Sequence, residues 1–432
     1  MSRAGTRRPP LPRDPVTVAV DGITHGGEGV ARLEGKAVFV PGALPGERVR
    51  IQVAEDRKRW ARATLLEVLE PAPERVEPPC PFVPDCGGCD LQHVSPAGQR
   101  ALKTRIVREQ LTRLGRLEDP PVAPCRAVGP ELGYRAQARL HADGAGRLGF
   151  HRAASTEVVP IDTCLVLTDG AQALRAEVGD TTGATEVRLR RFTADGDGAV
   201  VLTPGPGPLQ LPGGEADLLL TQPDGRTVAM RGDGEVEVDI DGLRFLVPAL
   251  SFFQPGVEAA TALLAEVVAA AGSIDGALVW DLYAGVGLLS LGLARAGAEV
   301  VAVEGDAPAT HAARRNAARN DLHLDVRTAA VGRFLRAAVG AIPPEEGPAP
   351  LDPPDVVVLD PPRSGAGERV LGDLATLAPA AIVYVACDPA ALARDTRTLH
   401  GLGYGLEHAQ PLELFPMTHH VEVVASFAPA RA

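Results

Sequence analysis

The strongest signal for the fold is the segment Leu278-Val279-Trp280-Asp281-Leu282-Tyr283-Ala284-Gly285-Val286-Gly287. Its apolar first half is typical of a buried strand. The two glycines at its end allow the backbone to turn tightly and to approach a ligand. A helical segment, Leu288–Ala296, follows at once. This order predicts a strand, a ligand-binding turn and a helix, the repeating unit of an α/β domain.

The same alternation continues to the end of the chain. Helices are expected at Val257–Ala271, Leu288–Ala296 and Ala307–Asn320. Valine-rich strands are expected at Leu278–Tyr283, Glu299–Glu304, Asp355–Asp360, Ala381–Ala386 and Val421–Phe427. Such alternation predicts a doubly wound parallel sheet. We therefore assign residues 251–432 to a Rossmann-like α/β domain.

Three segments precede this domain. Residues 1–14 are rich in Arg and Pro without periodicity and predict a disordered arm. Residues 15–72 hold five short β-prone runs separated by glycine turns, which predict a small closed barrel of the oligonucleotide-binding kind. Residues 73–250 combine a proline-rich linker, a cysteine cluster, a helix over 98–115 and an antiparallel β-rich region. The Asp-Gly pairs at 143–144, 195–196, 224–225 and 241–242 in that region suit hairpin turns.

Charge is distributed unevenly. The 432-residue chain has a net charge of -12, yet residues 1–62 carry 12 Lys and Arg against 7 Asp and Glu. A basic segment on an acidic chain is typical of a nucleic-acid contact, although a solvated basic tail and barrel without a partner remain the alternative. No apolar run predicts a membrane span, and the first ten residues lack the apolar core of a signal peptide. We expect a cytoplasmic monomer with no membrane partner.

The glycine turn predicts a nucleoside-bearing ligand. Glu304 ends the next strand, where a carboxylate can accept hydrogen bonds from both ribose hydroxyls. The turn at Gly285 and Gly287 lacks the three-glycine spacing that holds a pyrophosphate, which disfavours NAD. A methyl donor such as S-adenosylmethionine has no phosphate to hold. The rigid motif Asp360-Pro361-Pro362-Arg363 at a strand end also favours methyl transfer.

Cys387 is the candidate nucleophile. It follows the apolar run Ile382–Ala386 and precedes Asp388-Pro389 and a helix, so we expect the helix N-terminus to favour its thiolate. A thiolate that adds to C6 of a pyrimidine makes C5 nucleophilic toward a methylsulfonium, and a base must then remove the C5 proton. Glu422 is the favoured base, while His419 and His420 stay open as bases or metal ligands.

With these motifs in order, the chain resembles the uracil-5 RNA methyltransferase family over nearly its whole length. The resemblance implies donor contacts by Gln254 (in Phe252-Phe253-Gln254), Tyr283 and Leu288, with Glu304 as the ribose-binding acid. It also implies Asp360 as the acid at the reacting centre, Cys387 as the nucleophile and Glu422 as the base. The chain departs from the usual pattern at Pro255, Ala284, Leu288 and Asp388, and residues 328–332 lack the acid often placed near the adenine.

The remaining cysteines indicate a metal centre. Cys80, Cys86, Cys89 and the distant Cys164 supply four thiols, and four thiolates suit either zinc or an iron–sulfur cluster. The family resemblance favours a [4Fe–4S] cluster over zinc, and Cys125 is expected in a core. The barrel resembles a TRAM domain, in which residues 57–62 would contact RNA through cations and Trp60.

The resulting hypothesis is an S-adenosylmethionine-dependent RNA uracil-C5 methyltransferase that forms a covalent adduct between Cys387 and C6 of a uridine in rRNA or tRNA. One alternative is an RNA cytosine-C5 methyltransferase. Those enzymes typically use two cysteines in the catalytic domain, whereas residues 251–432 contain Cys387 alone. A second alternative is a non-catalytic iron–sulfur RNA-binding protein.

Overall fold

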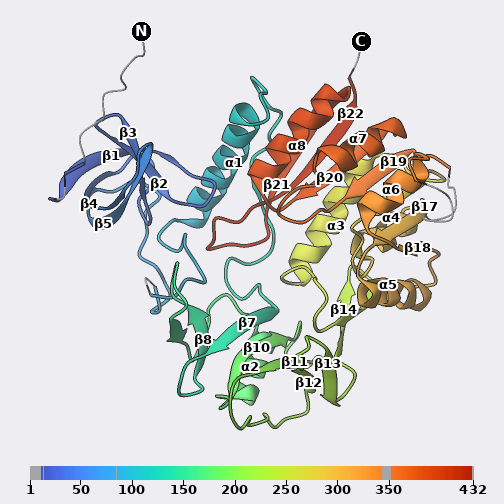
Figure 1. The fold of residues 1–432 in the computed structure, drawn as a ribbon, viewed down its shortest axis with the longest axis horizontal. Helices are drawn as coiled ribbons and strands as arrows, with labels where there is room; N and C mark the ends of the chain where they lie inside the picture. The colour runs from blue at the N-terminus through green and yellow to red at the C-terminus, as the bar shows by residue number, and fades with distance from the viewer. Residues whose placement is uncertain (1–10, 13, 84, 343–351, 431–432) are drawn as a thin grey trace.

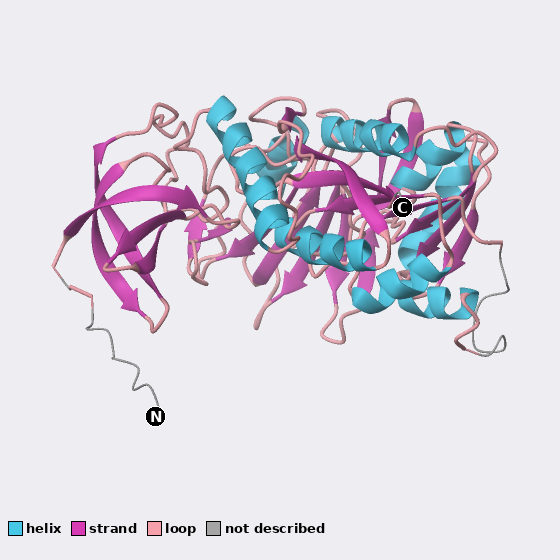
Figure 2. Cartoon of the chain, turned by 90° about the horizontal axis from the view of Figure 1, so that it is seen from above, coloured by secondary structure: helices cyan, strands magenta, loops and turns pink. Residues whose placement is uncertain are grey.

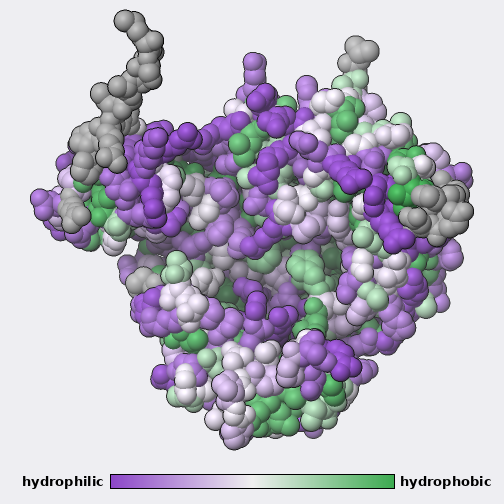
Figure 3. Space-filling view, in the orientation of Figure 1, coloured by the Kyte–Doolittle hydropathy of each residue, from purple (hydrophilic) through white to green (hydrophobic). Residues whose placement is uncertain are grey.

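The computed structural model describes residues 11–12, 14–83, 85–342 and 352–430. An N-terminal barrel lies beside helix α1 (Pro96–Arg113), and a β-rich central domain lies below them in Figure 1. The C-terminal α/β domain fills the other side of the molecule (Figure 1). Figure 3 shows a hollow on this face where the barrel, the central domain and the C-terminal domain meet.

The barrel has the five strands that the sequence predicts. They are β1 (Val16–Ile23), β2 (Gly29–Leu33), β3 (Lys36–Val40), β4 (Arg48–Asp56) and β5 (Trp60–Glu70), closed in the order β1-β2-β3-β5-β4. The predicted arm, residues 1–14, lies outside the described residues except for residues 11, 12 and 14. Leu11 is buried in the barrel core, and its N–H donates to Asp56 Oδ2 at 3.0 Å. The packed barrel therefore includes Leu11 and begins before its predicted boundary at residue 15.

Helix α1 follows the linker and joins the C-terminal domain. Ser95 caps it by accepting a hydrogen bond from Gly98 N at 3.2 Å, so it begins two residues before the predicted helix. It ends at Arg113, short of the predicted Gly115. Val107 and Leu111 of α1 are buried in the core on one face of the C-terminal sheet.

The central domain is a seven-stranded sheet in the order β13-β12-β11-β10-β7-β8-β9. Its strands are β7 (Gln137–Ala142), β8 (Leu148–His151), β9 (Val158–Pro160), β10 (Ala184–Arg190), β11 (Ala199–Pro204), β12 (Asp217–Thr221) and β13 (Thr227–Arg231). The Asp-Gly pairs at 143, 195 and 224 lie in loops that join antiparallel strands, as predicted. The all-antiparallel prediction is wrong at β11 and β12, which pair in parallel. Helix α2 (Asp169–Val178), capped by Thr168, was not predicted.

The hairpin of β14 (Glu235–Ile240) and β15 (Leu243–Pro248) forms a separate sheet, with its turn at the Asp-Gly pair 241–242. It packs in the same core as α3 (Val257–Ala271) and α4 (Leu288–Arg295). Leu246 N also donates to Asn316 Oδ1 of α5 (Ala307–Arg319) at 2.8 Å. The core of the C-terminal domain thus continues across the boundary predicted at residue 250.

The C-terminal sheet has the order β18-β17-β16-β19-β20-β22-β21-β6. Its strands are β16 (Leu278–Leu282), β17 (Glu299–Glu304), β18 (Asp325–Thr328), β19 (Val356–Leu359), β20 (Ala381–Ala386), β21 (Tyr404–Glu413), β22 (Glu422–Pro429) and β6 (Arg126–Ala127). The first five in this order are parallel, which confirms the α/β prediction. The prediction is wrong for β22, which runs antiparallel to β20 and β21. The loop 414–421 is too short for the crossover that a parallel neighbour requires.

Helices cover both faces of this sheet (Figure 2). Val279 of β16 packs with α3 and α4, whereas the next residue, Trp280, packs on the opposite face. That second face is covered by α1, α6 (Val331–Ala338), α7 (Glu368–Thr376) and α8 (Pro389–Gly401). Within the described ranges, no helix combines the length and apolar character that crossing a membrane demands.

Candidate active site

The predicted donor and catalytic residues gather at one edge of the C-terminal sheet. Tyr283, Glu304 and Asp360 stand at or just after the carboxyl ends of β16, β17 and β19, and Cys387 follows β20. The carboxyl ends of parallel strands share one edge, where doubly wound sheets bind ligands. Glu422 joins them because β22 is antiparallel, so its first residues pair with the last residues of β20.

A cavity of about 390 Å³ lies at this edge. Its lining includes five of the predicted donor-site residues: Gln254, Tyr283, Gly285, Leu288 and Asp360. The Gln254 side chain is 5% exposed, and its amide makes no hydrogen bond to any residue that the structure describes. Phe252 also lines the cavity and is 72% exposed, so an apolar ring stands at the edge of the cavity. The cavity therefore offers apolar walls with a few polar groups, which is typical of a small-molecule site.

The turn after β16 has left-handed backbone at Tyr283 (φ 67°), Gly285 (φ 56°) and Gly287 (φ 89°). Gly287 caps α4, and a Cβ there would lie 3.0 Å from Leu291 Cδ1, so glycine is needed for close packing as well as for the turn. Gly287 is not among the residues that line the cavity. Glu304 also lies outside this lining, so donor contacts by Gly287 and Glu304 stay predictions.

Two buried or half-buried acids hold this turn. Asp281 is fully buried and hydrogen-bonded by the Ser290 hydroxyl, and burial raises the pKa of its carboxyl to about 7. Glu304 Oε2 accepts from Gly285 N at 3.0 Å, and its Oε1 accepts from Asp306 N at 2.8 Å. A carboxylate has about four lone-pair sites, so Glu304 keeps acceptor capacity for a ligand after both backbone bonds.

Cys387 lies in a group of charged side chains. Burial, followed by the charges of Glu422 and Asp360, raises the pKa of the Cys387 thiol to about 11, while Arg363 acts in the opposite direction. In the free protein, burial and these two carboxyl groups therefore oppose the thiolate that we expected the helix N-terminus to favour. The dipole effect is a fraction of a charge, and it is outweighed by burial and two carboxyl groups.

The pKa values of the two acids beside Cys387 are also raised. Burial and then the charge of Asp360 raise the pKa of Glu422 well above its ordinary value, and Arg363 opposes the rise. Burial and the charge of Asp281 raise the pKa of Asp360 to about 7. Such shifted carboxyl groups in a cleft are typical of sites of proton transfer.

Arg363 is a residue that sequence analysis quoted but gave no role. Its loop is fixed by Asp395 of α8, whose Oδ2 accepts from Ala366 N at 2.7 Å and from Tyr384 Oη at 2.7 Å. The sequence position of Arg363, directly after Asp360-Pro361-Pro362, could have predicted it as a site residue. A charged side chain in that rigid loop must lie near the strand ends.

The histidine pair does not form a metal centre in the described residues. His419 Nδ1 and N both hydrogen-bond to the Asp90 carboxylate. Burial, with smaller effects from His419 and Arg363, lowers the pKa of His420 to about 4. His420 is therefore neutral at pH 7. The contact between Asp90 and His419 could not be predicted from the sequence, because 329 positions separate the two residues.

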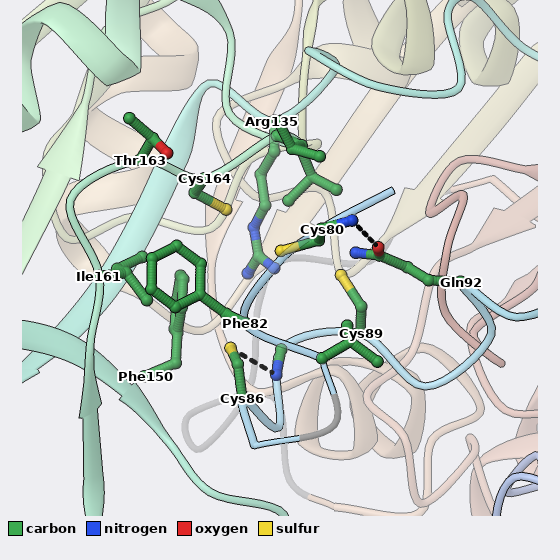
Figure 4. A pocket seen from close by; sticks show the side chains of 14 residues that line it. Cys80, Phe82, Cys86, Cys89, Gln92, Arg135, Phe150, Ile161, Thr163 and Cys164 are labelled. Carbon is green, nitrogen blue, oxygen red and sulfur yellow. Dashed lines mark hydrogen bonds between the residues drawn. The ribbon is translucent and has the colours of Figure 1, made fainter. Parts of the chain in front are cut away.

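The four predicted metal ligands line one apolar cavity of about 440 Å³. Figure 4 shows the sulfur atoms of Cys80, Cys86, Cys89 and Cys164 around the same space, with Phe82 and Arg135 beside them. Burial raises the pKa of Cys89 to about 12, and it also raises the pKa values of Cys86 and Cys164. Across the part of the chain that the structure describes, no three Cys, His, Asp or Glu side chains converge tightly enough to hold a single metal ion.

Cys125 is the sixth cysteine. It is 7% exposed and packs against α1 residues in the core, as predicted.

Comparisons with known proteins agree with this arrangement. The TRAM domain model matches residues 12–66, and the model named methyltransferase small domain matches residues 243–337. A protein of Alkalilimnicola ehrlichii named 23S rRNA (uracil(1939)-C(5))-methyltransferase RlmD is 37% identical, covering 98% of both chains. A Streptomyces coelicolor protein named uncharacterized RNA methyltransferase SCO5901 is also 37% identical, covering 96% of this chain and 92% of its own.

One solved structure matches nearly the whole chain. The Pyrococcus abyssi tRNA (uracil-54, C5)-methyltransferase, crystallised with S-adenosyl-L-homocysteine, has a TM-score of 0.73 and 24% identity over 95% of this chain and 99% of its own. The similarity therefore covers the barrel, the central domain and the C-terminal domain together. The chain belongs to the uracil-C5 RNA methyltransferase family.

Proposed function

We propose that this protein transfers a methyl group from S-adenosylmethionine to C5 of a uridine in ribosomal RNA. The observation that carries the proposal is the meeting of Cys387, Glu422, Asp360 and Arg363 at the sheet edge that also bears the cavity lined by Gln254 and Tyr283. The full-length relative named for 23S rRNA supports ribosomal RNA as the acceptor.

Cys387 acts as the nucleophile in this proposal. Its thiolate adds to C6 of the uracil, and C5 gains carbanion character. C5 then takes the methyl group as the S–CH3 bond of the donor breaks and S-adenosylhomocysteine departs. Glu422 removes the C5 proton so that the C6–S bond breaks and the Cys387 thiolate leaves. The raised pKa of the thiol means that it must lose its proton as the substrate arrives. The target base must be single-stranded or flipped out to reach this sulfur.

The donor would bind in the cavity beside the reacting group. Glu304, with two lone-pair sites left over, suits the ribose hydroxyls. The unpartnered amide of Gln254 suits a polar group of the donor, and Phe252 suits its aromatic base. Leu288 places an apolar side chain at a donor-contact position that is often polar, so we expect a weaker hold on the methionine end of the donor.

We also propose that the four-cysteine cavity holds a [4Fe–4S] cluster. Four thiols around one apolar space fit a cluster, which is larger than a single ion whose thiolate ligands lie within about 2.3 Å of the metal. When bound, the cluster would connect Cys164 of the central domain to the 80–89 loop. Its role would be structural, because methyl transfer requires no redox step.

The proposal is tested with purified protein, radiolabelled methyl donor and total rRNA from cells that lack this gene. Nucleoside mass spectrometry should identify 5-methyluridine, and Cys387→Ala should abolish it while donor binding survives. Formation of 5-methylcytidine would support the cytosine-C5 alternative instead. Absence of donor binding by calorimetry would support the non-catalytic alternative, and full turnover by Cys387→Ala would refute the mechanism.

A further inference from the structure

We infer that Arg190 and Gln137 of the central domain are positioning residues for the donor site, because they fix the segment that carries Gln254 into the cavity. This inference rests on the proposed function, since it takes the cavity at the sheet edge as the site of S-adenosylmethionine. It deepens that function by assigning part of the donor affinity to two residues that lie outside the cavity lining.

One wall of the cavity is a segment without regular structure. Residues 249–256, which we call the linking segment, join β15 to α3. Phe252, Phe253 and Gln254 of this segment line the cavity, and its other walls are the turn after β16, the start of α4 and Asp360. The position of the linking segment therefore sets where the Gln254 amide lies relative to a bound donor.

The guanidinium group of Arg190 holds the start of this segment. Its Nη1 donates to Pro248 O at 2.6 Å, and its Nη2 donates to Ser251 O at 2.7 Å. Nη2 also donates to Gln137 Oε1 at 2.8 Å, across the strand pair of β10 and β7 in which Arg190 and Gln137 are direct partners (Figure 1). One planar group thus binds both ends of the turn 248–251, which a side chain with a single donor atom cannot do.

Gln137 extends the same hold toward Gln254. Its Nε2 donates to Phe253 O at 2.9 Å, one residue before Gln254. Its neighbour Ala136 donates through N to Pro255 O at 2.6 Å, one residue after Gln254. The backbone on both sides of Gln254 is therefore bound to the central domain, which preorganises the amide for a ligand.

Arg190 is an unusual residue to bury. It is 5% exposed and forms no ion pair with any residue that the structure describes, whereas the similarly buried Arg191 pairs with Glu177 at 2.6 Å. Burial lowers the pKa of Arg190 to about 10, so the group stays charged at pH 7. Burying a charge without a counter-ion is costly, and an apolar side chain of similar length would avoid that cost. Stability alone therefore does not account for an arginine at this position.

Calorimetry with S-adenosylhomocysteine, the product form of the donor, tests the inference without requiring methyl transfer. The full-length protein is titrated in the absence of RNA. Arg190→Lys replaces the planar fork with one ammonium that cannot occupy both Nη positions. It should raise the Kd roughly 2- to 13-fold, the affinity carried by one neutral hydrogen bond, here that of Gln254. Gln137 is only half-buried, so Gln137→Ala removes the hydrogen bond to Phe253 with less risk to folding and should raise the Kd within the same range.

Arg175→Lys is the matched control. Arg175 of α2 is 8% exposed, and its guanidinium group also donates to backbone carbonyls, Gly179 O at 3.1 Å and Ile161 O at 3.3 Å. None of its hydrogen bonds within the described ranges reaches the linking segment. Arg175→Lys should lose stability in urea comparably to Arg190→Lys, yet bind S-adenosylhomocysteine as the wild-type protein does.

A double-mutant cycle shows whether Arg190 acts through Gln254. Gln254→Ala should weaken binding by itself, and adding Arg190→Lys should then change the Kd by less than about twofold, because no amide remains to be positioned. In turnover, the KM for the donor should rise in Arg190→Lys while kcat at saturating donor stays within about twofold of wild type. Independent, fully multiplicative effects in the double variant would overturn the inference.

The outcomes separate this inference from the proposed function. An unchanged Kd in both Arg190→Lys and Gln137→Ala, with normal binding by the wild-type protein, would overturn the inference and leave the function standing. An equal loss of affinity in Arg175→Lys would also overturn it, because general loosening of the central domain would then explain both variants. Absence of S-adenosylhomocysteine binding by the wild-type protein would refute the proposed donor site, and the inference with it.

Discussion

The raised pKa of Cys387 predicts slow alkylation of this thiol in the free enzyme. Iodoacetamide reacts with the thiolate, and a pKa of about 11 in place of 9.0 leaves about one-hundredth of the ordinary thiolate fraction at pH 8. We therefore expect Cys387 to react about 100-fold more slowly than an exposed thiol at that pH.

The sign of the pH dependence follows from the same shift. The charged form is the reactive one and its formation is disfavoured by burial, so the rate should rise about tenfold per pH unit from pH 7 and level off only near pH 11. Asp360→Asn removes a nearby negative charge and should move the profile to lower pH.

The assay is peptide mapping by mass spectrometry after timed alkylation. This separates Cys387 from the other five cysteines, and Cys387→Ser is the control for peak assignment. A rate that levels off at or below pH 8 would refute the reasoning, because the helix N-terminus would then outweigh burial and the two carboxyl groups. An unchanged pH profile in Asp360→Asn would show that the Asp360 carboxyl does not raise the pKa of the Cys387 thiol.

Three further predictions concern neighbouring groups. Glu422→Gln should still transfer the methyl group but accumulate a covalent protein–RNA complex on denaturing gels; normal release of product without a complex would exclude Glu422 as the base. Asp90→Ala removes both hydrogen bonds to His419 and should lower kcat about tenfold with donor binding by calorimetry unchanged, whereas Asp85→Ala in the same loop should have no effect. Lys103→Met removes the buried ammonium from the Glu413 carboxylate, which keeps Arg100 Nη1 at 3.2 Å, and should cost about 1–3 kcal/mol in urea unfolding, a loss that Lys103→Met/Glu413→Leu should partly reverse; equal losses in both would contradict the ion-pair argument.

Local patterns were enough for much of the fold. The strand, turn and helix around Gly285 depend on neighbouring residues only, because an apolar run, two glycines and a helical segment each act over a few positions. The same holds for the barrel strands and for the Asp-Gly hairpins. Errors arose where pairing was non-local, as in the parallel contact of β11 with β12 and the antiparallel direction of β22.

Residue type and spacing were sufficient to predict roles for Cys387, Glu422 and the four clustered cysteines. A lone thiol at a strand end and four spaced thiols can both be recognised from the sequence alone. Tertiary structure alone decided that Glu422 lies next to Cys387, through the reversed direction of β22, and that Asp90 binds His419 across 329 positions. It also decided the protonation of Cys387, since burial and the charges of Glu422 and Asp360 act through space. Local conformation follows from covalent neighbours, whereas pKa values and site geometry follow from groups that only folding brings together.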